Sequence, residues 1–173
     1  MENTLQHKLS RIKLLIMDVD GTLTDSGMYF SESGEELKRF STRDGMGITL
    51  LRKSGIQTAI LTSENSNIAV ARAEKLKIDH VIINCRTKSQ AAKDLAERLC
   101  LSIDEVAFIG DDVNDLQAVR VVGLSCCPSD AVDLIKNEVD IISNFNGGCG
   151  AVRELAEKIL LSQNKPVELP EGC

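Results

Sequence analysis

The chain has 173 residues and a formal net charge of −6; 43% of its residues are apolar and 27% are charged. This balance is typical of a folded globular protein, and folding at this length buries roughly 70% of the surface of the unfolded chain. The acidic charge and the scarcity of aromatic residues argue against a nucleic-acid surface, and every apolar run is too short to cross a bilayer. We therefore expect neither a nucleic acid nor a membrane as partner.

The six cysteines are irregularly spaced, and no pair of Cys-x-x-Cys motifs marks a zinc site. The sequence does not start with the basic residues and the following apolar segment that are typical of a secretory signal, so we do not expect one. We expect reduced thiols and a cytoplasmic location.

Short apolar runs alternate with helical patterns along the chain. Buried strands are predicted at 13–17, 58–61, 80–83 and 106–109, with weaker candidates at 123–126 and 139–142. Apolar residues at helical spacing predict helices around 91–99 and 152–160. This alternation predicts an α/β fold, a Rossmann-like doubly wound parallel sheet covered by helices on both faces.

One segment interrupts the alternation. Residues 28–40 carry two mixed runs around a Ser-Gly turn, which predicts a β-hairpin that projects beside the strand ends, before a helix that starts near Asp44. No linker or repeat divides the chain, so we expect one domain over 1–173, with a core at about 11–163 and a tail at 164–173. The glycine-rich segment Gly147–Gly150 allows another segment of the backbone to approach it closely. Arg153, which follows this segment, is expected to contact the substrate or to pair with Glu154 or Glu157.

Polar side chains follow four of the predicted strands. Asp18 and Asp20 follow the first strand, Thr62 the second, and Asp111 the fourth, while Lys88 opens the helix after the third. An Asp after a strand is usually a turn former or a helix cap, but parallel strands bring all these groups to one edge of the sheet.

These residue types suit phosphoryl transfer through an aspartyl phosphate. Asp18 is the expected nucleophile, and Asp20 the general acid and then the general base. Thr62 and Lys88 are expected to hold the phosphate oxygens. Mg²⁺ prefers oxygen ligands, which Asp18, Asp20 and Asp111 can supply, with Asp112 and Asp115 in support.

The pattern resembles the haloacid dehalogenase superfamily of phosphatases. Asp18-Val19-Asp20-Gly21-Thr22 matches its first motif, Thr62 the second, Lys88 the third, and Gly110-Asp111-Asp112 with Asp115 the fourth. The chain leaves no room for the cap domain that most of these phosphatases carry. The resemblance therefore narrows to the cap-less branch, which hydrolyses phosphate esters of 3-deoxy-2-ulosonic acids and forms homotetramers in which neighbours act as the cap.

Three alternatives stay open. A response-regulator receiver uses similar residues, but its lysine comes last and it lacks Asp-x-Asp-Gly-Thr. A catalytically silent scaffold of the same fold typically lacks the nucleophile or its metal partner, whereas Asp18, Asp20, Lys88 and Asp111 are all present. The third alternative is a phosphatase for another small sugar phosphate.

The substrate type depends on the residues after Thr62. The resemblance associates Gly-Arg here with 3-deoxy-D-manno-octulosonate (KDO) 8-phosphate, whereas Glu64, Arg72 and Lys75 resemble the type that acts on nonulosonate (KDN or sialic acid) 9-phosphates. Ser63 fits neither pattern fully, and Cys149 departs from the usual Arg or Glu. If a helix starts early, 64, 68, 72 and 75 share one face. The expected substrate contacts are Arg43, Asp44, Ser63, Glu64, Arg72, Lys75 and Asn114.

Overall fold

The four apolar residues of β1 (Leu14–Met17) are all buried, which fits a strand at the centre of a sheet. In the computed structural model, which describes residues 4–169, alternate β1 residues belong to two different hydrophobic clusters. Leu15 and Met17 lie in one cluster, and Leu14 and Ile16 lie in the other. The unbroken apolar run therefore reflects burial on both faces of the sheet.

The central sheet has six parallel strands in the order β5-β4-β1-β6-β7-β8. The chain runs outward from β1 through β4 and β5, and then crosses to the other side for β6, β7 and β8. This reversal beside β1 is where doubly wound sheets form ligand sites, at the carboxyl ends of the strands. The other strands are β4 (Gln57–Leu61), β5 (His80–Ile82), β6 (Val106–Ile109), β7 (Leu124–Cys127) and β8 (Ile141–Ile142).

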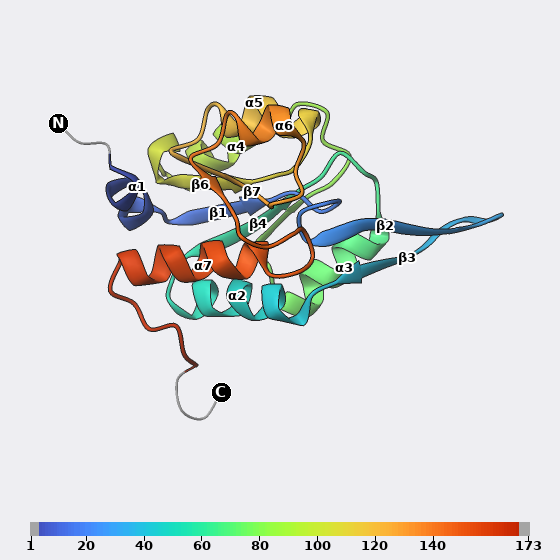
Figure 1. The fold of residues 1–173 in the computed structure, drawn as a ribbon, viewed down its shortest axis with the longest axis horizontal. Helices are drawn as coiled ribbons and strands as arrows, with labels where there is room; N and C mark the ends of the chain where they lie inside the picture. Colours follow the sequence, from blue (N-terminus) through green and yellow to red (C-terminus); the bar gives the residue numbers. More distant parts are fainter. Residues whose placement is uncertain (1–3, 170–173) are drawn as a thin grey trace.

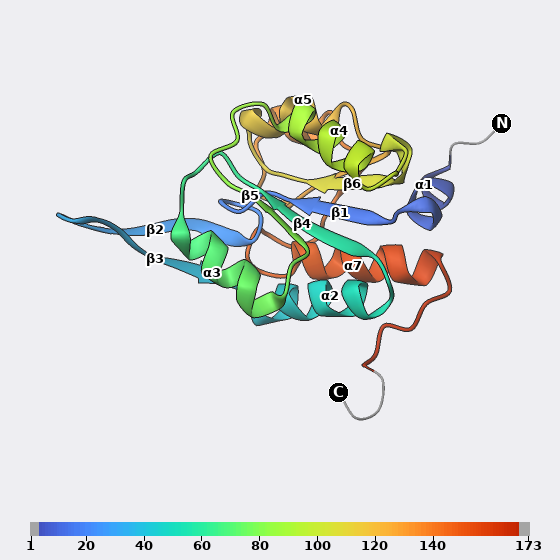
Figure 2. The same ribbon diagram turned by 180° about the vertical axis from the view of Figure 1, so that it is seen from behind.

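Helices cover both faces of the sheet (Figures 1 and 2). One hydrophobic cluster draws on α1, α2, α3 and α7, and the other on α4, α5 and α6. The predicted doubly wound fold without a cap domain is thereby confirmed. The helices are α1 (Leu5–Arg11), α2 (Thr42–Lys53), α3 (Asn67–Leu76), α4 (Lys88–Arg98), α5 (Leu116–Val119), α6 (Asp133–Lys136) and α7 (Ala151–Ser162), with 3₁₀ turns at Ile103–Glu105 and Val113–Asp115.

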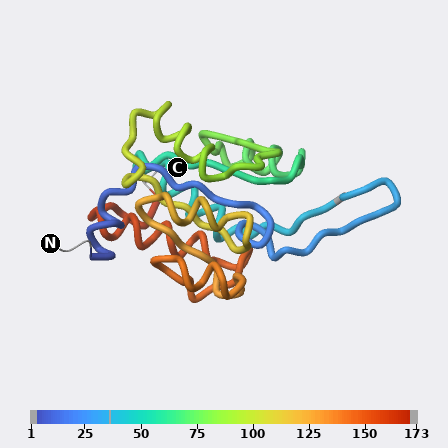
Figure 3. The backbone as a smooth tube through the Cα atoms, turned by 90° about the horizontal axis from the view of Figure 1, so that it is seen from above, coloured from blue at the N-terminus to red at the C-terminus, as the bar shows by residue number. Residues whose placement is uncertain are grey.

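The predicted hairpin is present and projects away from the sheet (Figure 3). It consists of β2 (Thr24–Ser31) and β3 (Gly34–Phe40), and its pairing contains register shifts. The hairpin starts four residues before the predicted segment, because Thr24 already pairs with Phe40. Its outer part exposes three large apolar side chains: Tyr29 is 61% exposed, Phe30 68% and Leu37 62%.

Several predicted boundaries shift by a few residues. Lys13 precedes β1, β7 extends to Cys127, and α2 begins at Thr42, where the Ser41 side chain caps it. The predicted helical face of α7 is buried. Val167, in the predicted tail, packs against the cluster that contains α7.

The glycine-rich segment before α7 supports the loop that follows β1. A Cβ atom on Gly147 would lie 1.9 Å from the carbonyl oxygen of Gly21, and Gly148 donates its N–H to the carbonyl of Thr22 at 2.9 Å. The close backbone approach expected from the sequence is therefore present. Arg153 pairs with Glu157 at 2.6 Å, one of the two outcomes predicted for it.

Candidate active site

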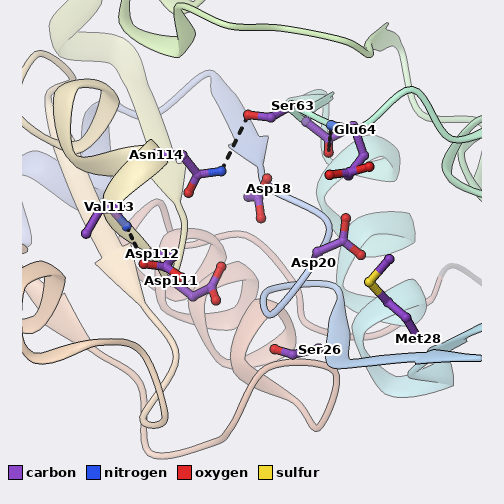
Figure 4. Close-up of a pocket in the computed structure, with 11 residues that line it drawn as sticks. Asp18, Asp20, Ser26, Met28, Ser63, Glu64, Asp111, Asp112, Val113 and Asn114 are labelled. Atoms are coloured by element: carbon purple, nitrogen blue, oxygen red, sulfur yellow. Dashed lines mark hydrogen bonds between the residues drawn. The ribbon is translucent and has the colours of Figure 1, made fainter.

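A pocket of about 330 Å³ opens at the carboxyl ends of β1, β4 and β6. Figure 4 shows Asp18 near its middle, with Asp20, Ser63 and Glu64 on one side and Asp111, Asp112 and Asn114 on the other. Most of the side chains predicted for the chemistry are thus brought together. The lining residues are Asp18, Asp20, Ser26, Met28, Thr62, Ser63, Glu64, Asp111, Asp112, Val113 and Asn114.

The turn after β1 has to admit the carboxylate of Asp111. Gly21 has a φ of +90°, and a Cβ atom there would lie 2.0 Å from Oδ2 of Asp111. The side chain of the next residue, Thr22, donates a hydrogen bond to Oδ1 of Asp111 at 3.4 Å. Glycine is therefore required at this position both for its backbone conformation and for space.

Lys88 links the ends of β1 and β6 through two ion pairs. Its Nζ lies 2.5 Å from Oδ1 of Asp18 and 2.6 Å from Oδ1 of Asp115, and all three side chains are almost fully buried. Asp115 also accepts the backbone N–H of Asp111 at 3.0 Å and of Asp112 at 3.4 Å, so it shapes the loop after β6. The fold thus positions the predicted nucleophile through a lysine on α4.

The carboxylates of this cluster outnumber its ammonium group. Burial, followed by repulsion from Asp115, raises the pKa of Asp18 to about 8, although Lys88 opposes the rise. Burial and repulsion from Asp115 and Asp112 raise the pKa of Asp111 to about 7. Burial by itself would lower the pKa of Lys88, but Asp18 and Asp115 raise it, so the lysine stays charged. The site therefore favours an additional cation.

The loop after β4 forms the opposite wall of the pocket. Thr62 is buried, and its hydroxyl accepts the backbone N–H of Glu64 at 3.2 Å. Ser63 accepts a hydrogen bond from the side-chain amide of Asn114 at 3.4 Å, which joins the two walls. Because α3 begins at Asn67, Glu64 lies in a loop and not on the helical face that we expected.

The sequence reasoning missed Lys38. This β3 residue forms ion pairs with Asp20 and with Glu35, and its side chain is fully buried. Lys38 lies opposite Met28 in the hairpin, and Met28 lines the pocket. The sequence did indicate that the hairpin lies beside the strand ends, and this was the available signal that one of its residues could reach the site. The pairing register of the two hairpin strands, which turns Lys38 toward Asp20, was not predictable from the sequence.

Four residues predicted to bind the substrate lie outside the pocket lining. Asp44 is buried and accepts the backbone N–H groups of Gly150 and Arg153 at the start of α7. Arg72 donates to the carbonyl of Ser41 and lies over the ring of Phe40, so it ties α3 to the hairpin exit. The other two, Arg43 and Lys75, are exposed.

The acidic residues at the pocket fit a divalent cation. One oxygen each of Asp18, Asp111 and Asp115 lies within 4.8 Å of the others. Asp115 already accepts Lys88 and two backbone N–H groups, so Asp18 and Asp111 are the better ligands. Oxygen ligands at one open edge suit Mg²⁺, which keeps several waters and a phosphate oxygen in its coordination.

Comparison with known proteins places the chain in a family. Residues 52–155 match the model of haloacid dehalogenase-like hydrolases. The chain is also 40% identical to the KDO 8-phosphate phosphatase KdsC of Escherichia coli K12 over 158 residues, which cover 91% of this chain and 84% of the relative. This chain belongs to the haloacid dehalogenase-like hydrolases. The predicted family and enzyme class, a phosphoric monoester hydrolase, are confirmed.

Two solved structures are close to this fold. The KDO 8-phosphate phosphatase of Moraxella catarrhalis, in complex with magnesium, phosphate and KDO, has a TM-score of 0.90 and 38% identity, covering 95% of this chain and 94% of that one. The cobalt-bound KDO 8-phosphate phosphatase of Haemophilus influenzae has a TM-score of 0.88 and 38% identity, and the match covers 91% of this chain and 92% of that one. Together with the acidic cluster of this chain, they confirm the predicted Mg²⁺ cofactor for the family. Within residues 4–169, no helix combines the length and the apolar character needed to cross a membrane.

The raised pKa values predict how stability depends on pH. In the folded, metal-free protein, Asp18 keeps its proton up to about pH 8 and Asp111 up to about pH 7. An ordinary Asp has a pKa of 3.8 and loses its proton near that pH. Their contribution to stability is complete below the ordinary pKa and is lost as the pH rises through the raised values. We expect the Tm of the metal-free protein to fall between about pH 5 and about pH 8, and excess Mg²⁺ to offset the fall.

Thermal unfolding in chelator and in Mg²⁺, across this pH range, measures the effect. Asp18→Asn is the matched variant, because it removes one titrating carboxyl and should flatten the slope. A metal-free Tm that rises over the same range would contradict the electrostatics described here.

Proposed function

We propose that this chain is a Mg²⁺-dependent phosphatase that hydrolyses the terminal phosphate ester of a 3-deoxy-2-ulosonic acid, with KDO 8-phosphate as the leading substrate. The observation that carries the proposal is the pocket in which Asp18, Thr62 and Asp111 meet, with Lys88 bound to Asp18 behind it. The KDO 8-phosphate phosphatases at about 40% identity support the substrate class. A catalytically silent scaffold domain of the same fold would not need these four residues together.

In the proposed first step, Oδ2 of Asp18 attacks phosphorus while Lys88 holds Oδ1. The bond between phosphorus and the ester oxygen breaks as the new bond to Asp18 forms. Asp20 gives its proton to the departing sugar oxygen, so the sugar leaves as a neutral alcohol. Thr62 and Lys88 hold the other phosphate oxygens.

In the proposed second step, Asp20 removes a proton from a water molecule that attacks phosphorus. The bond between phosphorus and Asp18 breaks, which releases phosphate and restores both carboxyl groups. Mg²⁺, held by Asp18 and Asp111 with support from Asp20 and the acidic loop after β6, offsets the negative charge that carboxylates and phosphate bring together.

A second candidate substrate is a nonulosonate 9-phosphate. Glu64 lines the pocket beside Asp20, where its carboxylate can accept hydrogen bonds from sugar hydroxyl groups. The same carboxylate repels the acid group of the substrate when that group comes close. A longer sugar acid keeps its carboxylate farther from the phosphate, and Glu64 therefore favours the nonulosonate over KDO.

Phosphate release tests the substrate. We expect turnover with Mg²⁺ on KDO 8-phosphate or KDN 9-phosphate and at least about tenfold lower kcat/KM on hexose phosphates, because differential contacts of 1–3 kcal/mol change rates by about that factor or more. Glu64→Gln, which keeps the shape but not the charge, should change KM more for the preferred ulosonate than for a hexose phosphate. No turnover of either ulosonate would remove the proposed function.

The intermediate is tested by Asp18→Asn. The amide cannot form an acyl phosphate, so we expect kcat to fall by about 10³-fold or more, in line with the loss of a catalytic nucleophile. Asp104→Asn is the control, since Asp104 is exposed in the 3₁₀ turn that precedes β6. Near-normal activity of Asp18→Asn would exclude the aspartyl phosphate.

We also propose a homotetramer in which the hairpin of one chain covers the pocket of a neighbour. The exposed Tyr29, Phe30 and Leu37 form an apolar surface on the hairpin that contact between copies would bury.

Light scattering measures this assembly, and we expect a tetramer for the native chain. Phe30→Asp places a charge on the apolar surface and should shift the population to smaller species, whereas Glu32→Gln, at the exposed tip of the same hairpin, should not. A monomeric native chain would contradict the proposal.

A cytoplasmic location is likewise a proposal. Among residues 4–169, the cysteines at 85, 100, 126, 127 and 149 are free thiols, which suits a reducing compartment.

A further inference from the structure

The base of the hairpin places a buried ammonium group against Asp20. Nζ of Lys38 donates to Oδ1 of Asp20 and lies 3.0 Å from Oε1 of Glu35. The side chain of Lys38 is fully buried, whereas 26% of the Asp20 side chain is exposed. A buried ammonium is costly unless it is paired and held in a fixed geometry, so these contacts constrain both carboxylates.

The lysine is itself anchored to the core. Oε2 of Glu35 accepts the hydroxyl of Ser66 at 3.2 Å. Ser66 is buried and precedes the first residue of α3, whose Ala69 and Ala73 lie in the hydrophobic core. A continuous set of polar contacts therefore runs from α3 through Glu35 and Lys38 to Asp20.

The contact uses only one of the two carboxylate oxygens of Asp20. Oδ2 is inaccessible to solvent and has no hydrogen-bond partner. A buried carboxylate oxygen without a partner is uncommon, so the contact of the other oxygen with Lys38 is what holds the carboxyl group in this orientation. Asp20 nevertheless lines the pocket, and 26% of its side chain is exposed, so a substrate oxygen beside Asp18 can reach the exposed side of this carboxyl group.

We propose that Lys38 is a positioning residue for Asp20: by holding one carboxylate oxygen, it fixes the orientation in which the Asp20 side chain meets the leaving oxygen of the substrate. The proposal rests on the proposed function in taking Asp20 as the general acid. Lys38 contacts neither substrate nor phosphorus in this proposal and acts only through Asp20. Glu35 and Ser66 in turn fix Lys38.

A purely structural role for Lys38 makes a different prediction. If Lys38 only attached the hairpin to the core, its loss would lower the activity toward all phosphate esters by a similar factor. If it positions the acid, its loss affects most those esters whose leaving group needs a proton. An alkyl phosphate needs this proton, whereas the nitrophenolate of p-nitrophenyl phosphate leaves without it at neutral pH.

The experiment compares kcat/KM for an alkyl phosphate and for p-nitrophenyl phosphate, because kcat/KM reports the steps through departure of the first product. We expect Asp20→Asn to lower the value for the alkyl ester by about 10²-fold or more, and Lys38→Met by about tenfold or more, with much smaller losses for p-nitrophenyl phosphate. In the double variant the Lys38→Met loss should vanish, because its effect passes through Asp20.

Arg39→Met is the matched control. Arg39 is the next residue of β3, is largely exposed and pairs with Asp25 within the hairpin, so its loss should not change the ratio of the two kcat/KM values. Because removing a buried ammonium can impair folding, Glu35→Gln is a second test, expected to shift the ratio in the same direction by a smaller factor. Thermal unfolding and light scattering on each variant check fold and assembly.

Equal losses on both esters, or additive losses in the double variant, would overturn the proposal. So would an Asp20→Asn variant without leaving-group selectivity, because Lys38 would then have no acid to position. Failure of the proposed substrate looks different: the native chain would hydrolyse both simple esters but neither ulosonate phosphate, and the ratio test would still decide the role of Lys38.

Discussion

The buried ion pairs of Lys88 with Asp18 and Asp115 are the interaction on which the site depends. They join the end of β1, the first residue of α4 and the loop after β6. Removing one member of a buried ion pair typically costs about 3–5 kcal/mol, because the remaining charge has neither water nor partner. The position of Lys88 is fixed in turn by α4, which packs Ala92 and Leu95 into the core. Helix packing thus determines the place of Asp18, the proposed nucleophile.

The same cluster explains why an acidic protein can accept an anionic substrate. Of the ammonium groups in residues 4–169, only that of Lys88 lies near the three carboxylates of Asp18, Asp111 and Asp115. Burial and the excess of negative charge together raise the pKa values of Asp18 and Asp111. A divalent cation supplies the missing positive charge and also attracts the phosphate. Metal and substrate therefore favour each other at this edge of the sheet, although the chain as a whole is negative.

The sheet and most of the pocket were predictable because they depend on local patterns. Buried parallel strands appear as continuous apolar runs, and the residues that follow them must meet at one edge. Asp18, Thr62 and Asp111 follow from this rule, and Lys88 follows from its place at the start of a helix. Asp44 and Arg72 do not line the pocket of the single chain, and there is a physical reason for their place. A charged side chain near a site can also satisfy buried backbone groups, as both do here. Lys38 depends on the irregular register of the hairpin, which no local pattern specifies.

The hairpin connects the chemistry of the pocket with the outer surface of the molecule. An isolated two-stranded hairpin is at best marginally stable, so its geometry depends on contacts at its base or at its outer part. At the base, these contacts are the Lys38 ion pairs and the Arg72 guanidinium over Phe40. At the outer part, Tyr29, Phe30 and Leu37 become stabilising only when another surface covers them. Any partner that orders the hairpin also favours the arrangement in which Lys38 holds Asp20. By linkage, a substrate that binds to a correctly placed Asp20 favours the ordered hairpin in return.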